Sequence, residues 1–247
     1  MMAERVTPRR RGSYGIDAPY WAAALVVLIV AELVLAIMSG KIWSFLPVVL
    51  LLAIFGSALY TTLRGKFLVW AELLDKLGLR GDERILDLGC GRGAVLLMAA
   101  QRLTTGRAVG IDLWRSADQS GNSAEATQRN AIAEGVADRI ELHTGDITAL
   151  PFADNSFDMV VSSLAIHNIS GRAGREKAIN EAVRVLRPGG RLLIADIRGT
   201  RHHEAQLAKM GMSDVTRRRL GWRFWWGGPW AATRLVTATK PVPATPE

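Results

Sequence analysis

Cysteine is nearly absent from this sequence, which has one, Cys90, among 247 residues. A single thiol excludes an intramolecular disulfide framework and any zinc or iron–sulfur site built on several cysteines. Histidine is also scarce, and the adjacent pair His202 and His203 has no partners at a metal-ligand spacing, so we expect no metal site. Repeats and low-complexity tracts are missing, and 49% of the residues are hydrophobic, which excludes disordered and collagen-like proteins.

Charge is almost missing from two stretches near the amino terminus. Residues 20–38 carry one charge, Glu32, and residues 42–60 carry none. Each stretch has 19 residues, close to the ~20 that cross a bilayer as a helix. Only three residues separate them, so we predict a transmembrane helical hairpin over residues 20–63. A cleaved signal peptide fits less well, because a second apolar run follows the first at once.

Basic residues are concentrated at the two outer ends of the predicted hairpin, which lie on the same side of the membrane. The turn between the two runs has only Lys41, whereas the outer flanks carry Arg5, Arg9, Arg10, Arg11, Arg64 and Lys66. The positive-inside rule therefore places both termini in the cytoplasm and the hairpin in the cytoplasmic (inner) membrane. We therefore predict that residues 1–19 form a basic cytoplasmic arm and that residues 64–247 form a cytoplasmic domain.

Short apolar runs alternate with helix-length polar stretches after the hairpin. Strands are predicted at residues 84–88, 108–112, 140–143, 159–163 and 191–196, and helices at 67–77, 94–103, 124–134 and 174–185. Such alternation indicates a mostly parallel sheet with helices on both faces. Ligands in these sheets bind at the carboxyl ends of the strands.

A glycine-rich loop follows the first predicted strand. It reads Asp87-x-Gly89-x-Gly91-x-Gly93, and a helical pattern begins directly after it. Alternate glycines let the backbone turn sharply and approach a ligand closely. A carboxylate at this loop suits a cationic ligand and would repel a pyrophosphate. The segment from about residue 67 to residue 241 thereby resembles the class I S-adenosylmethionine (SAM)-dependent methyltransferases.

The resemblance implies a fold, a cofactor and a set of residues around it. The implied fold is a Rossmann-like α/β domain with a mostly parallel seven-stranded sheet, here preceded by the two-helix transmembrane hairpin. The implied cofactor is SAM, with Asp87 near its ammonium group, Asp112 at the ribose hydroxyls and Asp146 at the adenine amino group. The full implied set is Asp87, Gly89, Cys90, Gly91, Gly93, Asp112, Leu113, Trp114, Asp146, Ile147 and Ser162.

The acceptor pocket of this family lies beyond the fourth strand, where this chain carries His167 and Asn168. His167 is the best candidate for a base or an orienting residue, because the pKa of free histidine lies near neutrality. Its alternative is a structural histidine. The polar loop at residues 114–123 contributes Asp118 as a third catalytic candidate. This loop is either a lid over the cofactor or a surface loop whose residues cap the next helix.

Residues 217–230 combine four arginines with four tryptophans. The fold implied by the resemblance places a late hairpin here, with residues 232–238 as its returning strand. The composition suits a membrane-interface surface or the rim of an apolar substrate pocket. Core packing beside a solvated basic face is the plainer alternative. Nucleic-acid binding also uses arginine and aromatic residues, but a membrane hairpin would keep the protein from most such partners.

Together these features predict a membrane-anchored SAM-dependent methyltransferase. The expected acceptor is a lipophilic small molecule, either quinone-like, a phenol, a thiol or a lipid. The alternative is a SAM-binding regulatory or assembly protein of the membrane without catalysis. The sequence disfavours that alternative, because each cofactor position we compared carries a suitable residue. The oligomeric state does not follow from the sequence.

Overall fold

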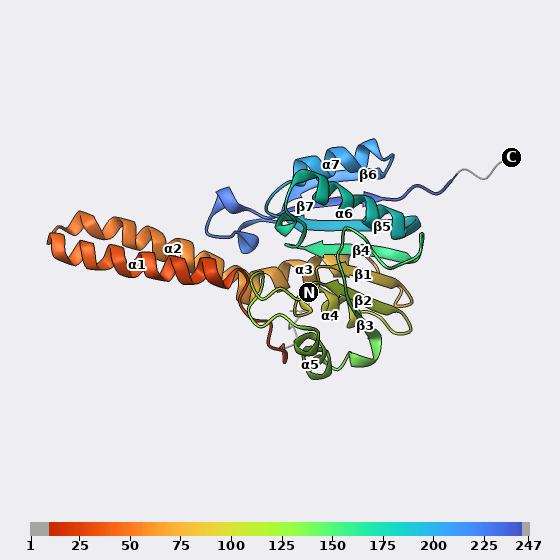
Figure 1. The fold of residues 1–247 in the computed structure, drawn as a ribbon, viewed down its shortest axis with the longest axis horizontal. Helices are drawn as coiled ribbons and strands as arrows, with labels where there is room; N and C mark the ends of the chain where they lie inside the picture. Colours follow the sequence, from red (N-terminus) through yellow and green to blue (C-terminus); the bar gives the residue numbers. More distant parts are fainter. Residues whose placement is uncertain (1–9, 244–247) are drawn as a thin grey trace, which may run out of the picture.

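Two antiparallel helices project from one end of an α/β domain in the computed structural model, which describes residues 10–243 (Figure 1). Helix α1 (Pro19–Ser39) has proline in its first turn and ends at Gly40, which adopts a left-handed φ of 63°. The chain returns through a 3-10 turn (Ile42–Phe45) into α2 (Leu46–Tyr60). The two helices thus occupy the stretches in which charge is nearly absent.

The apolar side chains of this pair are mostly exposed. Only 11% of the apolar window of each helix is buried, whereas the core helix of a water-soluble protein is mostly buried. The side chains buried in the pair are Leu25, Ala36, Val48 and Ala58. Both helices are long and apolar enough to cross a membrane by length and composition.

The second helix does not end where the apolar run ends. A π-helical turn (Thr61–Gly65) joins α2 to α3 (Lys66–Lys76), and the result is one helix of 35 residues, Ile42–Lys76. We expected separate helices at residues 42–60 and 67–77. No proline interrupts the chain between them, and Gly65 keeps right-handed helical geometry. The hairpin is therefore joined to the domain by continuous helix rather than by a loop.

Gly65 lies where this long helix touches the segment at residues 222–224. A Cβ atom on Gly65 would overlap the carbonyl oxygen of Arg223. We expect Gly65→Ala to push the two segments apart and to lower the free energy of unfolding by about 1–3 kcal/mol. Gly56→Ala on the same helix is the matched control, because a Cβ there meets nothing within 4 Å. Denaturant titration of both variants in detergent tests this contact, and equal stability would show that the contact is dispensable.

The domain contains a seven-stranded sheet, as predicted. Its order is β3-β2-β1-β4-β5-β7-β6, with β7 antiparallel to both neighbours and the other neighbouring pairs parallel. The strands are β1 (Arg84–Leu88), β2 (Arg107–Asp112), β3 (Ile140–Thr144), β4 (Phe157–Ser163), β5 (Leu186–Asp196), β6 (Ser213–Arg219) and β7 (Arg234–Thr239). The Rossmann-like fold class is confirmed.

Helices cover both faces of the sheet (Figure 1). One core layer includes side chains of α3, α4 (Ala94–Ala100) and α5 (Ala124–Glu134), and the other includes side chains of α6 (Arg172–Val185) and α7 (Thr200–Lys209). Alternate strand residues divide between the layers, as Ile85 and Leu86 do in β1. The alternation of apolar residues did not predict α7, since only Thr200, His203 and Leu207 of that helix are buried.

The described part of the amino-terminal arm packs on the domain. Tyr14 is buried against Phe67, with ring centroids 5.0 Å apart, and its hydroxyl donates to Glu134 Oε1 at 3.0 Å. The backbone amides of Arg11 and Gly12 donate to the same carboxylate oxygen. Arg5 and Arg9, counted above among the orientation signals, lie outside the described residues. Residues 10–18 therefore connect α5 with the start of the helical hairpin.

Candidate active site

The glycine-rich loop joins the carboxyl end of β1 to α4. Gly89, Gly91 and Gly93 have left-handed φ values of 69°, 52° and 85°, which side-chain-bearing residues rarely adopt. A Cβ on Gly91 would also lie 2.5 Å from the Gln119 side-chain oxygen. Cys90 is buried within the loop, and burial raises the pKa of its thiol well above the usual value. The loop thus offers a ligand its backbone rather than a reactive sulfur.

Asp87 is a buried carboxylate without a partner. The residue is 2% exposed, and neither carboxylate oxygen accepts a hydrogen bond of good geometry from residues 10–243, although the Leu96 amide approaches the carboxylate. Burial raises the pKa of Asp87 to about 7, against the opposing effect of the Leu96 amide, and the Asp112 carboxylate adds to the rise. A buried, unpaired acid is costly unless a cation or donor meets it. The site is therefore suited to a ligand ammonium group at Asp87.

Asp112 is fixed at the end of β2 with both oxygens oriented. Its Oδ2 accepts from the Gly91 amide at 2.8 Å, and its Oδ1 accepts from the Trp114 amide at 2.6 Å and the Asn122 side chain at 3.1 Å. A carboxylate has about four acceptor positions, so these three bonds leave capacity at Oδ2. Asp112 is thus able to accept from a ligand hydroxyl while it holds the glycine-rich loop.

The residues beside Asp112 form the outer wall of this region. Leu113 is exposed, and Trp114 has a left-handed φ of 57° while its indole nitrogen donates to Thr144 Oγ1 at 2.7 Å. After β3, Ile147 is buried, and the exposed Asp146 accepts from the Thr148 amide at 2.8 Å. An apolar side chain and an exposed acid therefore stand at the end of β3.

Ser162 differs from the other residues that the resemblance implies. It is buried in β4, and its hydroxyl donates to the Leu88 carbonyl at 3.0 Å. This hydrogen bond ties β4 to β1 inside the sheet. The described contacts of Ser162 are accordingly structural ones.

His167 and Asp196 form a close pair at the carboxyl ends of β4 and β5. His167 Nδ1 lies 2.7 Å from Asp196 Oδ1, and the His167 amide donates to Asp196 Oδ2 at 3.1 Å. Asp196 is completely buried, whereas the His167 side chain is 18% exposed. Leu164, just upstream, has a left-handed φ of 59°, a strain often found at functional sites. The ring contact lacks hydrogen-bond geometry, but it places a buried acid beside a partly exposed histidine, an arrangement that suits a general base.

Asn168, the neighbouring candidate, is exposed, and its side-chain amide makes a long hydrogen bond of 3.5 Å to the Leu164 carbonyl. Because this bond is weak and the side chain faces solvent, Asn168 is free to reorient. Asp118 lies in the loop that crosses toward His167. Partial burial raises the pKa of Asp118, the Asp112 carboxylate adds to the rise, and Arg115 and His167 oppose it.

The polar loop at residues 114–123 has two sets of contacts, one with helix α5 and one with the glycine-rich loop. Ser123 caps α5 by accepting from the Ala126 amide at 3.1 Å. Gln119 is buried, and its side-chain oxygen accepts from the Arg92 amide at 2.8 Å. The loop therefore begins a helix at one end and lies against the glycine-rich loop at the other.

Asp17 was not predicted to be part of this site. Its Oδ1 accepts from the Gln119 side chain at 2.9 Å, and its Oδ2 lies 2.5 Å from Lys66 Nζ and 2.6 Å from Thr62 Oγ1. The adjacent Ala18 amide donates to the Asp118 carbonyl at 3.0 Å. No local sequence pattern marks Asp17, because its partners come from segments far apart along the chain. The base of the helical hairpin is thereby bound to the loop that covers the glycine-rich loop.

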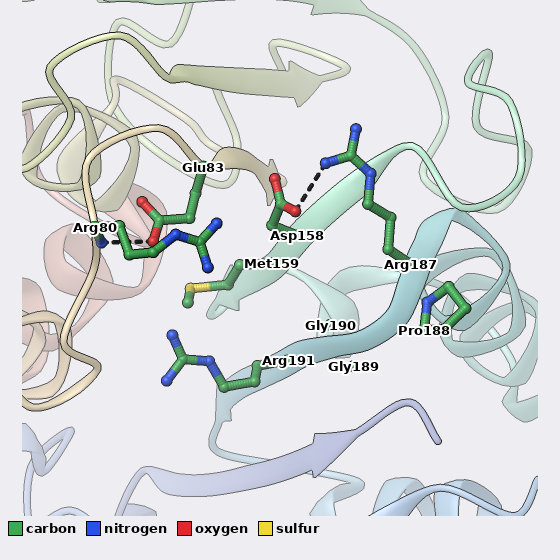
Figure 2. Close-up of a pocket in the computed structure, with 9 residues that line it drawn as sticks. All are labelled: Arg80, Glu83, Asp158, Met159, Arg187, Pro188, Gly189, Gly190 and Arg191. Carbon is green, nitrogen blue, oxygen red and sulfur yellow. Dashed lines mark hydrogen bonds and ion pairs between the residues drawn. The ribbon is translucent and has the colours of Figure 1, made fainter. Parts of the chain in front are cut away.

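A separate cavity of about 220 Å³ lies at the opposite, amino-terminal end of β4 and β5 (Figure 2). Three arginines line it, but each has a partner. Arg187 pairs with Asp158 at 2.8 Å, Arg191 donates to the Leu77 carbonyl at 2.8 Å, and Arg80 pairs with Asp82 at 3.0 Å. Its charged groups are engaged in holding the fold, so we assign the active site to the carboxyl ends of the strands.

Comparison with known proteins finds similarity to methyltransferases in the central part of the chain. A protein-family model described as "Methyltransferase domain" matches residues 86–194. The ubiquinone/menaquinone biosynthesis C-methyltransferase UbiE of Roseobacter denitrificans is 37% identical over 129 residues, which are 52% of this chain and 48% of that protein. Methyltransferase GfsG of Streptomyces halstedii is 37% identical over 131 residues, 52% of this chain and 44% of that protein. The chain thus spans about half the length of these curated relatives.

Solved structures share the fold at lower sequence identity. A SAM-dependent methyltransferase from Aquifex aeolicus superposes with a TM-score of 0.54 and 18% identity, covering 68% of this chain and 87% of that one. The geranyl diphosphate C-methyltransferase of Streptomyces coelicolor A3(2) gives a TM-score of 0.55 and 18% identity, covering 69% and 76%. The sheet and its flanking helices are therefore shared with enzymes of this fold, whereas the matches leave part of this chain uncovered.

Proposed function

We propose that this chain is a class I SAM-dependent methyltransferase. It methylates a lipophilic, quinone-type acceptor at a membrane surface. The observation that supports this proposal most directly is where the helical hairpin joins the domain. Asp17 and Ala18, which lead into α1, bind Gln119 and Asp118 of the loop beside the glycine-rich loop. The candidate active site and the apolar helices therefore share one end of the domain.

Residues at the carboxyl ends of β1 and β2 suit the cofactor. SAM supplies the methyl group and its own leaving group when bound. Asp87 would hold the ammonium group, because it is a buried carboxylate that lacks a partner among residues 10–243. Asp112 would accept from the ribose, and the glycine backbone would lie against the amino-acid portion. The chain itself contributes binding, alignment and exclusion of water to an in-line methyl transfer.

A proton must leave an acceptor that is methylated at an O–H, S–H or ring C–H position, and His167 is placed to take it. Its Nδ1 lies 2.7 Å from the Asp196 carboxylate without hydrogen-bond geometry, and a small rotation of the ring would let Nδ1–H donate to that acid. The Nε2 atom is then the free base. Asp196 acts as a positioning residue that fixes the tautomer and the ring orientation.

The acceptor class rests on the relatives and on the hairpin. UbiE is named for ubiquinone and menaquinone biosynthesis, and quinones of this kind dissolve in bilayers. If α1 and α2 cross the membrane, the active site faces the surface from which such a molecule would enter. The flanking arginines then place the domain and both termini on the cytoplasmic side.

Transfer of labelled methyl groups tests the function directly. The full chain in phospholipid vesicles is incubated with labelled SAM and panels of demethylated quinones, phenols, thiols and added lipids. We expect label in the quinone-type panel, and far less label with Asp87→Asn at a SAM concentration that does not saturate this variant, because it lacks the cofactor carboxylate. Tight SAM binding with no label in any panel would instead support the regulatory or assembly alternative.

A further inference from the structure

The connection between β6 and β7 contains a tryptophan-rich segment that lies beside the second apolar helix. Trp222 stacks on Tyr60 with ring centroids 5.3 Å apart, and the Trp225 carbonyl accepts from Thr61 at 2.6 Å and Ser57 at 3.3 Å. Gly227 lies against Ile54. The segment, residues 220–233, thus follows the helix back toward its apolar middle.

The depth of this contact follows from helix geometry. Ile54 precedes Arg64 by ten residues, which is about 15 Å along a helix axis. The polar headgroup layer on each side of a bilayer is only about 5–8 Å thick. If Arg64 lies at the headgroup level, the part of the segment beside Ile54 reaches the outer edge of the hydrocarbon layer.

The backbone of the segment is bonded in the way that lipid contact requires. Amides within it donate to carbonyls within it: Leu220 to Thr233, Phe224 to Gly221, Trp225 to Trp222, Trp226 to Ala231, Ala231 to Gly228 and Thr233 to Phe224. Its single charge, Arg223, makes two hydrogen bonds to Glu72 at 2.7 and 2.8 Å. Insertion into an apolar phase requires polar groups that are satisfied within the protein, and these bonds meet that condition for most of the segment. Trp226 Nε1 and Thr233 Oγ1 are the exceptions, since both are buried without a hydrogen-bond partner among the described residues.

Two large side chains remain uncovered on this segment. Trp222 is 61% exposed and Trp230 is 68% exposed, while Phe224 between them is completely buried and fastens the segment to the core. Tryptophan favours the boundary between headgroups and acyl chains, because its ring is apolar and its N–H is polar. Their place beside the exposed apolar helix α2 makes lipid the environment that these two side chains fit.

We propose that residues 220–233 form a third membrane contact, in which Trp222 and Trp230 insert into the lipid interface beside the helical hairpin. The partner is the phospholipid bilayer itself. This inference rests on the proposed membrane anchoring, and it adds that the domain is held at a fixed depth. Because the segment packs on Tyr60, Thr61 and Gly65, its contact with the bilayer would also fix the position of α3 and the sheet relative to the membrane.

Quenching of tryptophan fluorescence by brominated phospholipids tests this contact. The full chain is prepared as Trp21→Phe/Trp43→Phe, which removes the two hairpin tryptophans, and is reconstituted into phosphatidylcholine vesicles with bromine near the headgroup end of the acyl chains. We expect clear quenching, which falls at least roughly twofold when Trp222→Phe and Trp230→Phe are added. Trp114→Phe in the same background is the matched control and should leave the quenching unchanged.

The outcomes separate this inference from the proposal on which it rests. Vesicle flotation reports membrane anchoring by the hairpin, and far-ultraviolet circular dichroism reports folding of each variant. A chain that does not float overturns the anchoring and this inference with it. A chain that floats but shows the same quenching with and without Trp222 and Trp230 overturns this inference alone. These side chains would then be candidates for contact with an acceptor or with another protein.

Discussion

Asp87→Asn is expected to weaken SAM binding roughly hundredfold while making the cofactor-free protein more stable. The weaker binding follows because a buried charge pair between Asp87 and the ligand ammonium would be lost, and losing one partner of such a pair costs about 2–5 kcal/mol. The higher stability follows because the unpaired, buried carboxylate is itself unfavourable. If Asp87→Asn weakens SAM binding and also raises the free energy of unfolding, then Asp87 serves binding at the expense of stability.

The pH dependence of stability has a definite direction. The pKa of Asp87 is raised to about 7, above its usual value of 3.8, so the folded state retains a proton that the unfolded chain releases. The unfavourable contribution is absent below about pH 4, grows as pH rises toward 7 and is complete above it. The advantage of Asp87→Asn should therefore reach a few kcal/mol at pH 8 and vanish at acidic pH.

The pH dependence of binding has the opposite direction. Only the ionised carboxylate attracts an ammonium group, so SAM affinity of the unsubstituted protein should fall by up to about tenfold for each pH unit below 7. Asp87→Asn should remove this dependence. Calorimetric titration and thermal unfolding across pH 5–8 measure both effects.

Asp158→Asn is the matched control for Asp87→Asn. Asp158 belongs to the neighbouring strand β4, but it accepts from the Arg84 amide and pairs with Arg187 at the opposite end of the sheet. The variant should lose stability and keep its SAM affinity. Unchanged SAM affinity in Asp87→Asn would remove the ammonium assignment.

His167→Gln is expected to lower kcat by about a hundredfold to ten-thousandfold with little change in SAM affinity. This range is the usual contribution of a positioned general base. Glutamine keeps a polar side chain of similar size but does not take up the proton. The rise of kcat with pH that a histidine base produces should disappear with it. Steady-state kinetics with the acceptor identified by methyl labelling, from acidic to basic pH, measures both effects.

Asp196→Asn tests the positioning role separately. It should lower kcat and leave SAM affinity nearly unchanged, because the charge beside His167 Nδ1 is lost and the orientation of the imidazole should loosen. Asp196 also accepts from the Ile197 amide at 2.6 Å, so SAM binding is needed as the check on folding. His202→Gln is the matched control, since His202 is exposed on α7. A His167→Gln enzyme with normal kcat would show that His167 is a structural histidine.

The fold was predictable because its signals are local. Apolar strands separated by amphipathic helices indicated the sheet, and the predicted helix at residues 124–134 matches α5, where Ser123 and Gly135 cap the two ends. The join between hairpin and domain was not predicted correctly. Whether a helix continues through residues 61–65 depends on packing against residues 222–225, which no window of sequence contains.

In the candidate site, too, some features were predictable from adjacent residues and others depended on distant segments. Asp87 and the glycines are recognisable because the residues that make a tight strand-to-helix turn are adjacent in sequence. The His167–Asp196 pair and the Asp17 contacts depend on distant segments brought together by strand order and by the arm that crosses the loop at residues 114–123. The cofactor and acceptor roles of these residues remain predictions for the experiments above.

The sequence alone excluded an intramolecular disulfide and a metal site built on several cysteines. It also indicated that two nearly uncharged runs form helices and that a glycine loop with Asp87 begins an α/β domain. Each follows from composition or from spacing within a few residues. Only the tertiary structure decided that Cys90 is buried with a raised pKa, that Asp87 has no partner among the described residues, and that Trp222 and Trp230 stand beside the apolar helix. Burial and unmet charge are properties of packing, which arise only when segments far apart in the chain come into contact.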